Sequence, residues 1–306
     1  MKGIIFSLIK IFLIIFLPPL MIGIINRVKT TWAGKYGQSI FQPFYDIIKL
    51  IKKSIIRSTS SSFILKIALV LQFISTIFAL LLIPFGKIKP FIYFEGDFFL
   101  FIGLLGLSTL SQIIIAMESA GSFQGMGASR EINFSIFVEP AILLLFASMI
   151  FYTKSYTLNK MFVEFAFLSL EKIMVGIILG VSFFLIILIE GKRIPIDDPA
   201  THLELTMIHE AMILDLSGKD LAISLYSGYL KIFIFSLITA NIFIPSFISI
   251  ELSILLLISI VLFIAILIGF IESLFPRVRM SHIPDFMLLV LSLSVIIVAL
   301  MFTMNT

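Results

Sequence analysis

The sequence of 306 residues contains no cysteine, and this absence restricts its chemistry at once. A chain without thiolates cannot ligate an iron–sulfur cluster through cysteine, and it cannot close a disulfide. Charged residues are also scarce, at 13% of the chain. If the protein takes part in redox chemistry, the redox centres must therefore belong to other subunits.

Apolar residues take the place of the missing charge. They make up 60% of the chain, and the mean hydropathy is +1.17, whereas soluble proteins contain roughly 45–50% apolar residues. An apolar run of about 20 residues crosses the hydrocarbon core as a helix, while barrel strands are shorter and alternate. The sequence therefore predicts an all-α polytopic integral membrane protein, with residues 1–306 forming a single transmembrane domain.

Hydropathy in windows of about 19 residues predicts about eight transmembrane helices. Their expected limits are Gly3–Ile25, Phe63–Ile83, Phe98–Met117, Ser135–Tyr152, Ile173–Ile189, Tyr226–Ile244, Leu252–Ile271 and Phe286–Phe302. The first span begins like a signal peptide but lacks a small-x-small cleavage site. We therefore expect it to be retained as a helix, with a kink at Pro18 and Pro19.

Basic residues are divided unevenly between the loops, and this division predicts the orientation. The first, third, fifth and seventh loops carry Arg27, Lys29, Lys35, Lys49, Lys52, Lys53, Arg57, Arg130, Lys192, Arg193, Lys219, Arg277 and Arg279. The even loops carry Lys87, Lys89, Lys154 and Lys160. Because basic loops face the cytoplasm, we expect cytoplasmic odd loops and both termini outside, in the cell inner (plasma) membrane. Orientation also explains the net charge of +4, so we expect no nucleic-acid partner.

The first loop predicts a further, amphipathic helix. Its apolar face consists of Phe44, Ile47, Ile48, Ile51 and Ile55. Its polar face consists largely of Asp46, Lys49, Lys52 and Lys53. This pattern is typical of a helix in the cytoplasmic interface of the membrane. Such a helix acts as a basic lipid anchor, as a docking site for a partner, or as both.

Acidic residues are concentrated beside two of the expected spans. The stretch from Glu190 to Asp220 contains four Asp, three Glu, two His and three basic residues. Ionisable groups at membrane depth usually have a function, such as a role in a proton relay. We therefore expect a proton-conducting path, which Glu272 could join. Its candidate members are Glu139, Glu190, Glu204, Glu210 and Asp215. The alternative for Glu139, inside the fourth span, is a carboxylate that holds two helices together.

Three motifs near these residues have structural rather than chemical interpretations. The glycines of Gly121–Gly127 lack the strand and α/β unit of a nucleotide loop. His202 and His209 do not form the His-Glu-x-x-His pattern of a zinc site, so we expect no metal ligands. Asp197-Asp198-Pro199 is typical of a helix start, and Gly218 of a helix end.

Four segments resemble the family of complex I subunit 1, which is the H-subunit family of NADH–quinone oxidoreductase. Residues Gly37–Lys53 resemble its first loop, and Gly127–Glu139 its third loop and fourth span. Residues Glu190–Asp197 and Ser217–Gly218 resemble its fifth loop. The resemblance covers essentially the whole chain, and it includes eight spans in the orientation deduced above.

Within that family, two blocks are similar to the membrane-anchor subunits of energy-converting group 4 [NiFe] hydrogenases, including the membrane subunit of formate hydrogenlyase. These blocks are Gly121–Leu145 and Ile194–Ala222. The resemblance implies a non-catalytic chain without cofactors, docked to hydrogenase large and small subunits, an Fe–S subunit and antiporter-like membrane subunits. The [NiFe] centre and [4Fe-4S] clusters would lie in those partners.

The resemblance also implies roles for single residues. Glu139, Glu190, Glu204 and Asp215 would belong to the acidic path that couples hydrogen evolution to ion translocation. The expected docking or loop-ordering residues are Arg130, Arg193, Asp197, Asp46 and Lys49.

Two departures from the quinone-reducing members favour the hydrogenase branch. The first span ends in Asn26-Arg27, where those members usually have a glutamate, and the fifth loop has His202 and His209 in place of further glutamates. The alternatives are the quinone-reducing membrane subunit of complex I itself and, from another class, a free-standing secondary transporter. A transporter would work alone and would show broken helices at mid-membrane.

Overall fold

The structure is a computed structural model that describes residues 2–58, 61–165, 170–197, 208–245, 247–276, 278 and 282–305. Eight helices in these ranges are long and apolar enough to cross a membrane, which confirms the predicted all-α polytopic fold. They are α1 (Lys2–Trp32), α3 (Phe63–Leu81), α4 (Asp97–Glu118), α5 (Ser122–Thr153), α7 (Leu170–Glu190), α9 (Gly218–Ile242), α10 (Ile250–Leu274) and α11 (Ile283–Asn305). The same ranges contain the shorter helices α2 (Gln42–Lys52), α6 (Leu158–Glu164) and α8 (His209–Ile213). The helix predicted in the first loop is therefore present as α2.

Three spanning helices are longer than their hydropathy predicts. Helix α1 continues through both prolines to Trp32, α5 begins at Ser122, and α9 begins at Gly218. The additional turns are rich in polar residues. They extend beyond the apolar core of each span, and a hydropathy window does not detect them.

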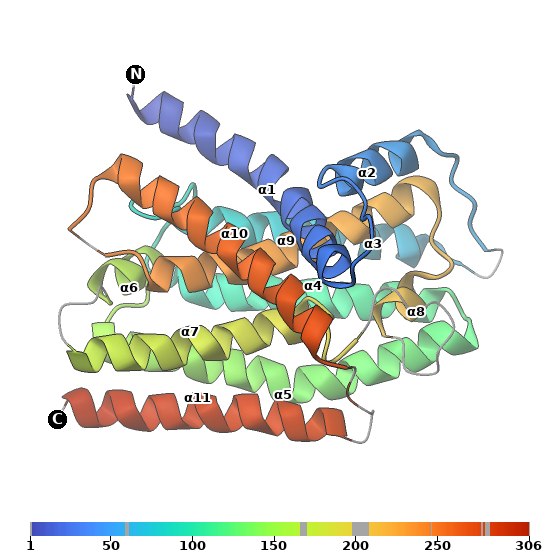
Figure 1. Cartoon of the computed structure of the whole chain (residues 1–306). Coiled ribbons are helices and arrows are strands. Elements are labelled where there is room, and N and C mark those ends of the chain that lie inside the picture. The colour runs from blue at the N-terminus through green and yellow to red at the C-terminus, as the bar shows by residue number, and fades with distance from the viewer. Residues whose placement is uncertain are drawn as a thin grey trace.

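The two ends of the bundle differ. Both termini lie at one end, and α2 and α8 lie at the other (Figure 1). We call the latter the basic end, because it carries the loops whose basic residues predict a cytoplasmic location. An even number of spans requires both termini to share a side, and the arrangement in Figure 1 meets this requirement.

Helix α9 is the centre of the bundle. It contacts α1, α2, α3, α7 and α10, and every residue from Leu230 to Ile242 is buried. A helix that is buried on all sides usually has apolar residues on all sides. The single charged residue in this segment, Lys231, must therefore find its partners inside the protein.

The chain segment that leads from α2 to α3 is fastened to the start of α9. Arg57 binds both carboxylate oxygens of Asp220, with Nε to Oδ2 at 2.7 Å and Nη2 to Oδ1 at 3.0 Å. The Ser217 hydroxyl accepts a hydrogen bond from the Ile56 amide at 2.7 Å and donates one to the Ile56 carbonyl at 2.6 Å. These contacts hold the first loop of the basic end against the fifth.

Gly218 begins α9, so its prediction as a helix end was wrong. Its φ of +53° is the left-handed conformation that glycine tolerates, here at the entrance to a helix. A Cβ atom at this position would lie 2.6 Å from the carbonyl oxygen of Ser54. Glycine is therefore needed for both its conformation and the close approach of the α2–α3 segment.

We expect Gly218→Ala to lower the thermal unfolding midpoint of the purified protein more than Gly34→Ala does. Gly34 has a φ of +67° but nothing within 4 Å of an added Cβ, so alanine there costs only the left-handed backbone, about 1–2 kcal/mol. Gly218→Ala adds a clash with Ser54 to that cost. Equal midpoints for the two variants, measured side by side in detergent, would contradict this account.

Candidate functional site

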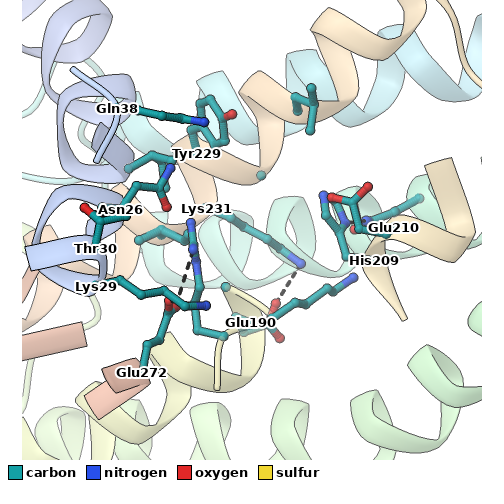
Figure 2. Close-up of a pocket in the computed structure, with 18 of the residues that line it drawn as sticks. Asn26, Lys29, Thr30, Gln38, Glu190, His209, Glu210, Tyr229, Lys231 and Glu272 are labelled. Atoms are coloured by element: carbon teal, nitrogen blue, oxygen red, sulfur yellow. Dashed lines mark hydrogen bonds and ion pairs between the residues drawn. The ribbon is translucent and has the colours of Figure 1, made fainter. Parts of the chain in front are cut away.

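A cavity of about 500 Å³ opens at the basic end. It reaches from Ala33 and Gln38, which follow α1, to Lys231 in the middle of α9 (Figure 2). Its charged lining residues are Lys29, Glu190, Lys192, Arg193, Glu210, Lys231 and Glu272. Ligand pockets are usually apolar with a few polar groups. The lining of this basic-end cavity is also largely apolar, but its charged side chains offer a charged route into the bundle.

One wall of the basic-end cavity is an ion cluster around Glu272 of α10, whose side chain is almost fully buried. Arg193 Nη1 lies 3.4 Å from one oxygen of Glu272, and Lys29 Nζ lies 3.6 Å from the other. Buried charges are tolerated only when they are paired. The cluster therefore fixes the segment that follows α7 against α1 and α10.

A second buried ion pair joins the same segment to α5. Lys192 Nζ lies 2.9 Å from Glu131 Oε1, and both side chains are 7% exposed. Burial lowers the pKa of Lys192, and the negative charge of Glu131 opposes that shift. The two consecutive basic residues after α7 thus point into the protein, each to its own glutamate.

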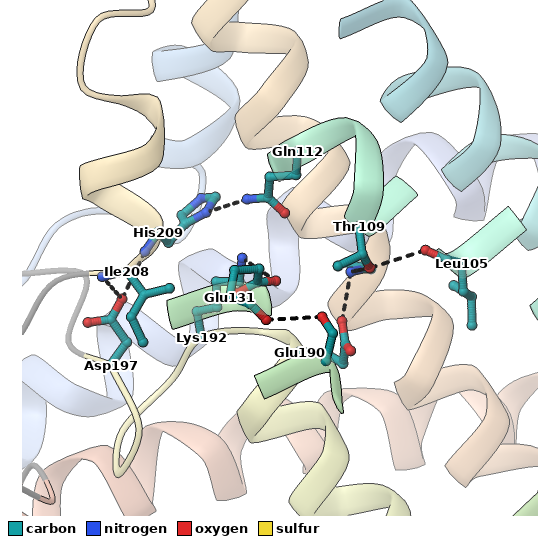
Figure 3. A network of polar contacts seen from close by, with 11 residues as sticks. Leu105, Thr109, Gln112, Glu131, Glu190, Lys192, Asp197, Ile208 and His209 are labelled. Atoms are coloured by element: carbon teal, nitrogen blue, oxygen red, sulfur yellow. Dashed lines mark hydrogen bonds and ion pairs between the residues drawn. The ribbon is translucent and has the colours of Figure 1, made fainter. Parts of the chain in front are cut away.

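A third pair lies deepest. Lys231 Nζ is 2.7 Å from Glu190 Oε2 and donates a hydrogen bond to Thr109 Oγ1 at 2.8 Å. Thr109 in turn donates to the Leu105 carbonyl at 3.2 Å. Figure 2 shows the pair of Lys231 and Glu190, and Figure 3 shows the contact of Thr109 with Leu105. Together these contacts join the last residue of α7 to the middle of α9 and to α4.

A small inner cavity of about 60 Å³ lies next to this third pair. Its polar lining consists of Thr109, Glu139, Glu190 and Lys231, and apolar residues of α4, α5 and α9 complete it. Glu139 stands on an exposed face of α5, well inside the spanning helix. Because Glu190 and Lys231 line both cavities, they connect the basic end to the lateral surface of the bundle at Glu139.

His209 lies beside this route as a neutral group. Its Nδ1 is 3.0 Å from Gln112 Nε2, so Nδ1 accepts and the ring proton belongs on Nε2. Burial lowers the pKa of His209 to about 3, and the positive charges of Lys192, Arg193 and Lys231 contribute to the same shift. The histidine is therefore uncharged near neutral pH.

Asp197 holds the short helix that carries His209. Its Oδ2 accepts hydrogen bonds from the backbone amides of Ile208 and His209, each at 3.0 Å. These amides are at the start of α8 and have no helical partner of their own. Asp197 therefore fixes the start of α8, whereas Asp198 and Pro199 of the predicted helix start lie outside the described residues.

The structure brings together three of the five predicted relay residues. Glu139 and Glu190 line the inner cavity, and Glu190 and Glu210 line the basic-end cavity. Asp215 is exposed and lines a separate small pocket with Arg57 and Asp220. Glu204 lies outside the described residues.

The predicted docking residues divide into exposed and buried groups. Asp46, which accepts a hydrogen bond from Gln42 at 2.8 Å, and Lys49 are exposed on α2. Arg130 is half-buried near the start of α5, where its Nη2 lies 3.3 Å from Met126 Sδ. Arg193 is only 6% exposed and faces Glu272 inside the bundle rather than the surface.

The sequence reasoning missed Lys231, Glu131 and Thr109. Lys231 could have been found, because it is a charged residue within the expected span Tyr226–Ile244 and such residues are functional candidates. Glu131 was hidden because the helical region before Ser135 was assigned to a loop. In the part of the chain that the structure describes, no group of three or more His, Asp or Glu side chains could hold a metal ion.

The eight spans and the two charge-lined cavities define an integral membrane protein with a polar route through part of its interior. A family model described as NADH dehydrogenase matches residues 3–304. The chain therefore belongs to the NADH dehydrogenase family, that of complex I subunit 1. This match confirms the resemblance found in the sequence.

The curated relatives include subunits of hydrogenase-type complexes and a subunit of an NADH-quinone oxidoreductase. The chain is 30% identical to hydrogenase-4 component C of Escherichia coli (strain K12) over 142 residues, which are 46% of this chain and 45% of that protein. It is 23% identical to formate hydrogenlyase subunit 4 of the same organism over 145 residues, 46% of each chain. It is 29% identical to the H subunit of NADH-quinone oxidoreductase from Wolbachia pipientis wMel over 188 residues, 56% of this chain and 54% of that one. The chain thus spans about half the length of the curated relatives it matches.

The fold is also found in a solved structure of an archaeal respiratory membrane complex, the membrane-bound sulfane sulfur reductase. The superposition covers 100% of both chains with a TM-score of 0.81 and 19% sequence identity. At this identity the likeness shows a shared fold.

The low pKa of His209 predicts that the folded protein becomes less stable in acid. Its pKa is about 3 in the folded protein, against 6.5 for a histidine side chain in water. As the pH falls below 6.5, the unfolded chain takes up a proton that the folded chain does not, so stability falls by up to about 1.4 kcal/mol per pH unit. We expect His209→Asn, which keeps an acceptor near the Nδ1 position, to flatten the fall in thermal midpoint between about pH 7 and pH 5.

The matched control for this measurement is His282→Asn. His282 is exposed and binds Asp285 at 3.1 Å, so its replacement should leave the pH profile as in the wild type. An unchanged profile in His209→Asn would show that another group causes the acid sensitivity.

Proposed function

We propose that this chain is the membrane-anchoring and coupling subunit of a membrane-bound [NiFe] hydrogenase complex. Family membership, with relatives from a hydrogenase, a formate hydrogenlyase and an NADH–quinone oxidoreductase, supports a membrane subunit of a complex I-like assembly. The observation that carries the coupling role is the position of Glu190. It lines both the cavity that opens at the basic end and the inner cavity that reaches Glu139.

In this proposal the redox chemistry takes place in partner subunits. Large and small hydrogenase subunits and an Fe–S subunit form a hydrophilic arm that carries the [NiFe] centre and the [4Fe-4S] clusters. The arm docks at the basic end, on the cytoplasmic side of the plasma membrane. Antiporter-like membrane subunits lie beside the bundle in the bilayer. The exposed charges of α2, among them Asp46 and Lys49, and Arg130 of α5 contribute to docking.

The route for protons runs from the basic-end cavity through Glu190 to Glu139. Glu190 is the last residue of α7, and the segment that follows it carries Lys192 and Arg193 to buried glutamates. A displacement of this segment by the docked arm would act directly on Glu190. The chain therefore contributes a mechanical and electrostatic link between the arm and the membrane path.

The rival functions differ in what the basic-end cavity accepts and in whether the chain acts alone. The size of the cavity, about 500 Å³, is that of a small-molecule site, which favours a quinone-reducing subunit as the second candidate. The charged side chains within its otherwise largely apolar lining have no counterpart in an apolar quinone ring, which disfavours that candidate. A free-standing transporter would move ions after reconstitution of this chain alone.

We expect Glu139→Gln to leave the complex assembled and to reduce coupled proton movement at least tenfold. Glutamine keeps the size of the side chain but cannot release a proton from the exposed face of α5. Hydrogen evolution from a reduced low-potential dye and acidification of inverted membrane vesicles would be recorded together. Glu95→Gln, at an exposed position in the loop before α4, is the control. Normal acidification in Glu139→Gln would exclude Glu139 from the path.

We expect Arg130→Glu to weaken attachment of the hydrophilic arm, because it reverses a charge at the basic end. The measurement is the amount of large hydrogenase subunit that co-purifies with the membrane part at increasing salt, since charge contacts are screened by salt. Lys154→Glu reverses an exposed charge at the opposite end of α5 and should have no effect. Arg193→Glu would disrupt the buried pair with Glu272 and is unsuitable for this purpose.

A further inference from the structure

We propose that Lys231 is a switching counter-ion, whose ammonium group alternates between Glu190 and Glu139 and thereby determines which carboxylate holds the proton. The proposal rests on the proposed relay function and assigns a working residue to it. Lys231 is a positioning residue, because it does not itself carry the proton.

The starting point is the isolation of Lys231. It stands in the part of α9 in which all residues from Leu230 to Ile242 are buried, and it is 4% exposed. Its ammonium group contacts Glu190 Oε2 at 2.7 Å and Thr109 Oγ1 at 2.8 Å. An ammonium has three donors, and the inner cavity provides the space for the third.

The inner cavity places two carboxylates around this one cation. Glu190 and Glu139 both line it together with Lys231, and Glu139 interacts electrostatically with both of the other two. The volume of about 60 Å³ is enough for a few water molecules, since one needs roughly 10–15 Å³. Protons can therefore pass between the carboxylates through water, while the lysine moves within the same space.

The neighbouring charges leave Lys231 as the counter-ion for both groups. Lys192 approaches from the segment after α7, but its ammonium is 2.9 Å from Glu131 of α5. Arg193 binds Glu272 on the other wall of the basic-end cavity. His209 of α8 is neutral. Among the described side chains around the inner cavity, Lys231 is the one available cation, so one of the two carboxylates is stabilised as an anion and the other is stabilised as an acid.

Lysine is suited to such movement. Its charge is compact and sits on four flexible methylene groups, whereas arginine holds a carboxylate in a fixed two-point geometry. Thr109 offers a neutral acceptor on the wall of the inner cavity, so the ammonium keeps a hydrogen bond as it leaves one carboxylate for the other. The buried side chain can therefore change partners without losing all its contacts.

The proton balance closes over a cycle. At first Lys231 pairs with ionised Glu190, and Glu139 is protonated. Glu139 then passes its proton to a basic acceptor group of the antiporter-like membrane subunit proposed to lie beside the bundle, Lys231 moves to Glu139, and Glu190 takes up a proton from the basic-end cavity. When Lys231 returns, the Glu190 proton passes through cavity water to Glu139. One proton has passed from the basic-end cavity to the lateral surface. The summed charge of the three side chains is zero at each resting stage.

Infrared spectroscopy of the intact complex in membranes tests the switch without any substrate. The quantity to compare between variants is the C=O stretching band of protonated carboxylic acids near neutral pH. This band should be lost in Glu139→Gln. It should also be lost in Glu190→Gln, because Lys231 then moves to Glu139 and ionises it. The band should return in the double variant Lys231→Met/Glu190→Gln, in which no cation is available.

A permanent Lys231–Glu190 pair gives a different result. In that case Glu139 titrates independently, and its band persists in Glu190→Gln, which would overturn the proposal. Glu190→Met, of similar volume, replaces Glu190→Gln if that variant does not assemble. Lys10→Met is the matched control, since Lys10 is also 4% exposed in a spanning helix but binds the backbone carbonyl of Lys89. Its spectrum should equal that of the wild type.

The outcome for the switch is separable from the outcome for the relay. Retention of the band in Glu190→Gln, together with loss of proton movement in Glu139→Gln, would overturn the switch and leave the relay intact. Loss of the band with normal proton movement in Glu139→Gln would support the exchange of partners and overturn the relay.

Discussion

The requirement that buried charges be paired governs the basic end of this protein. Three glutamates inside the bundle, Glu131, Glu190 and Glu272, each face a lysine or arginine at 2.7–3.6 Å. The two members of each pair come from different segments of the chain, so each pair is also a tertiary contact. An unpaired charge in such a place costs several kcal/mol, and the pairs thus fix the segment after α7 in one position.

The same pairs explain why the fifth loop is so rich in charge. Apart from the loop residues that lie outside the described ranges, its charged side chains largely turn inward. Lys192 and Arg193 bind glutamates of α5 and α10, and Asp197 holds the start of α8. These contacts hold residues 192–197 against α5, α8 and α10. The charged composition of the fifth loop therefore reflects contacts inside the membrane domain as much as a docking surface.

Much of the architecture followed from composition. Eight spans and the amphipathic helix at Gln42–Lys52 could be predicted, because apolar runs of sufficient length and a period of 3.6 residues are local signals. The ends of the helices could not, since the polar extensions of α5 and α9 resemble loops in a hydropathy plot. Gly218 was assigned to the wrong end of a helix, because a left-handed glycine is compatible with either end.

Only part of the candidate site could be predicted from the sequence. Glu139 and Glu190 could be selected because each is an acid beside or within an apolar run. Their connection through Lys231 depends on the packing of α4, α5, α7 and α9, which no local pattern encodes. Asp215 illustrates the opposite error. It belongs to the same acidic stretch, yet the fold turns it to the surface, away from both cavities.

Helix α5 has a mechanical consequence for the whole arrangement. Near its start, Gly127 allows the backbone of Ile208 to approach, so that α8 rests on it. Glu139 follows twelve residues later on the same helix, roughly 18 Å along its axis. Pro140, directly after Glu139, removes one backbone hydrogen bond and makes a natural bending point. The half-helix from Ser122 to Glu139 therefore links the contact with α8 near one end to the Glu139 carboxylate beside the proline at the other.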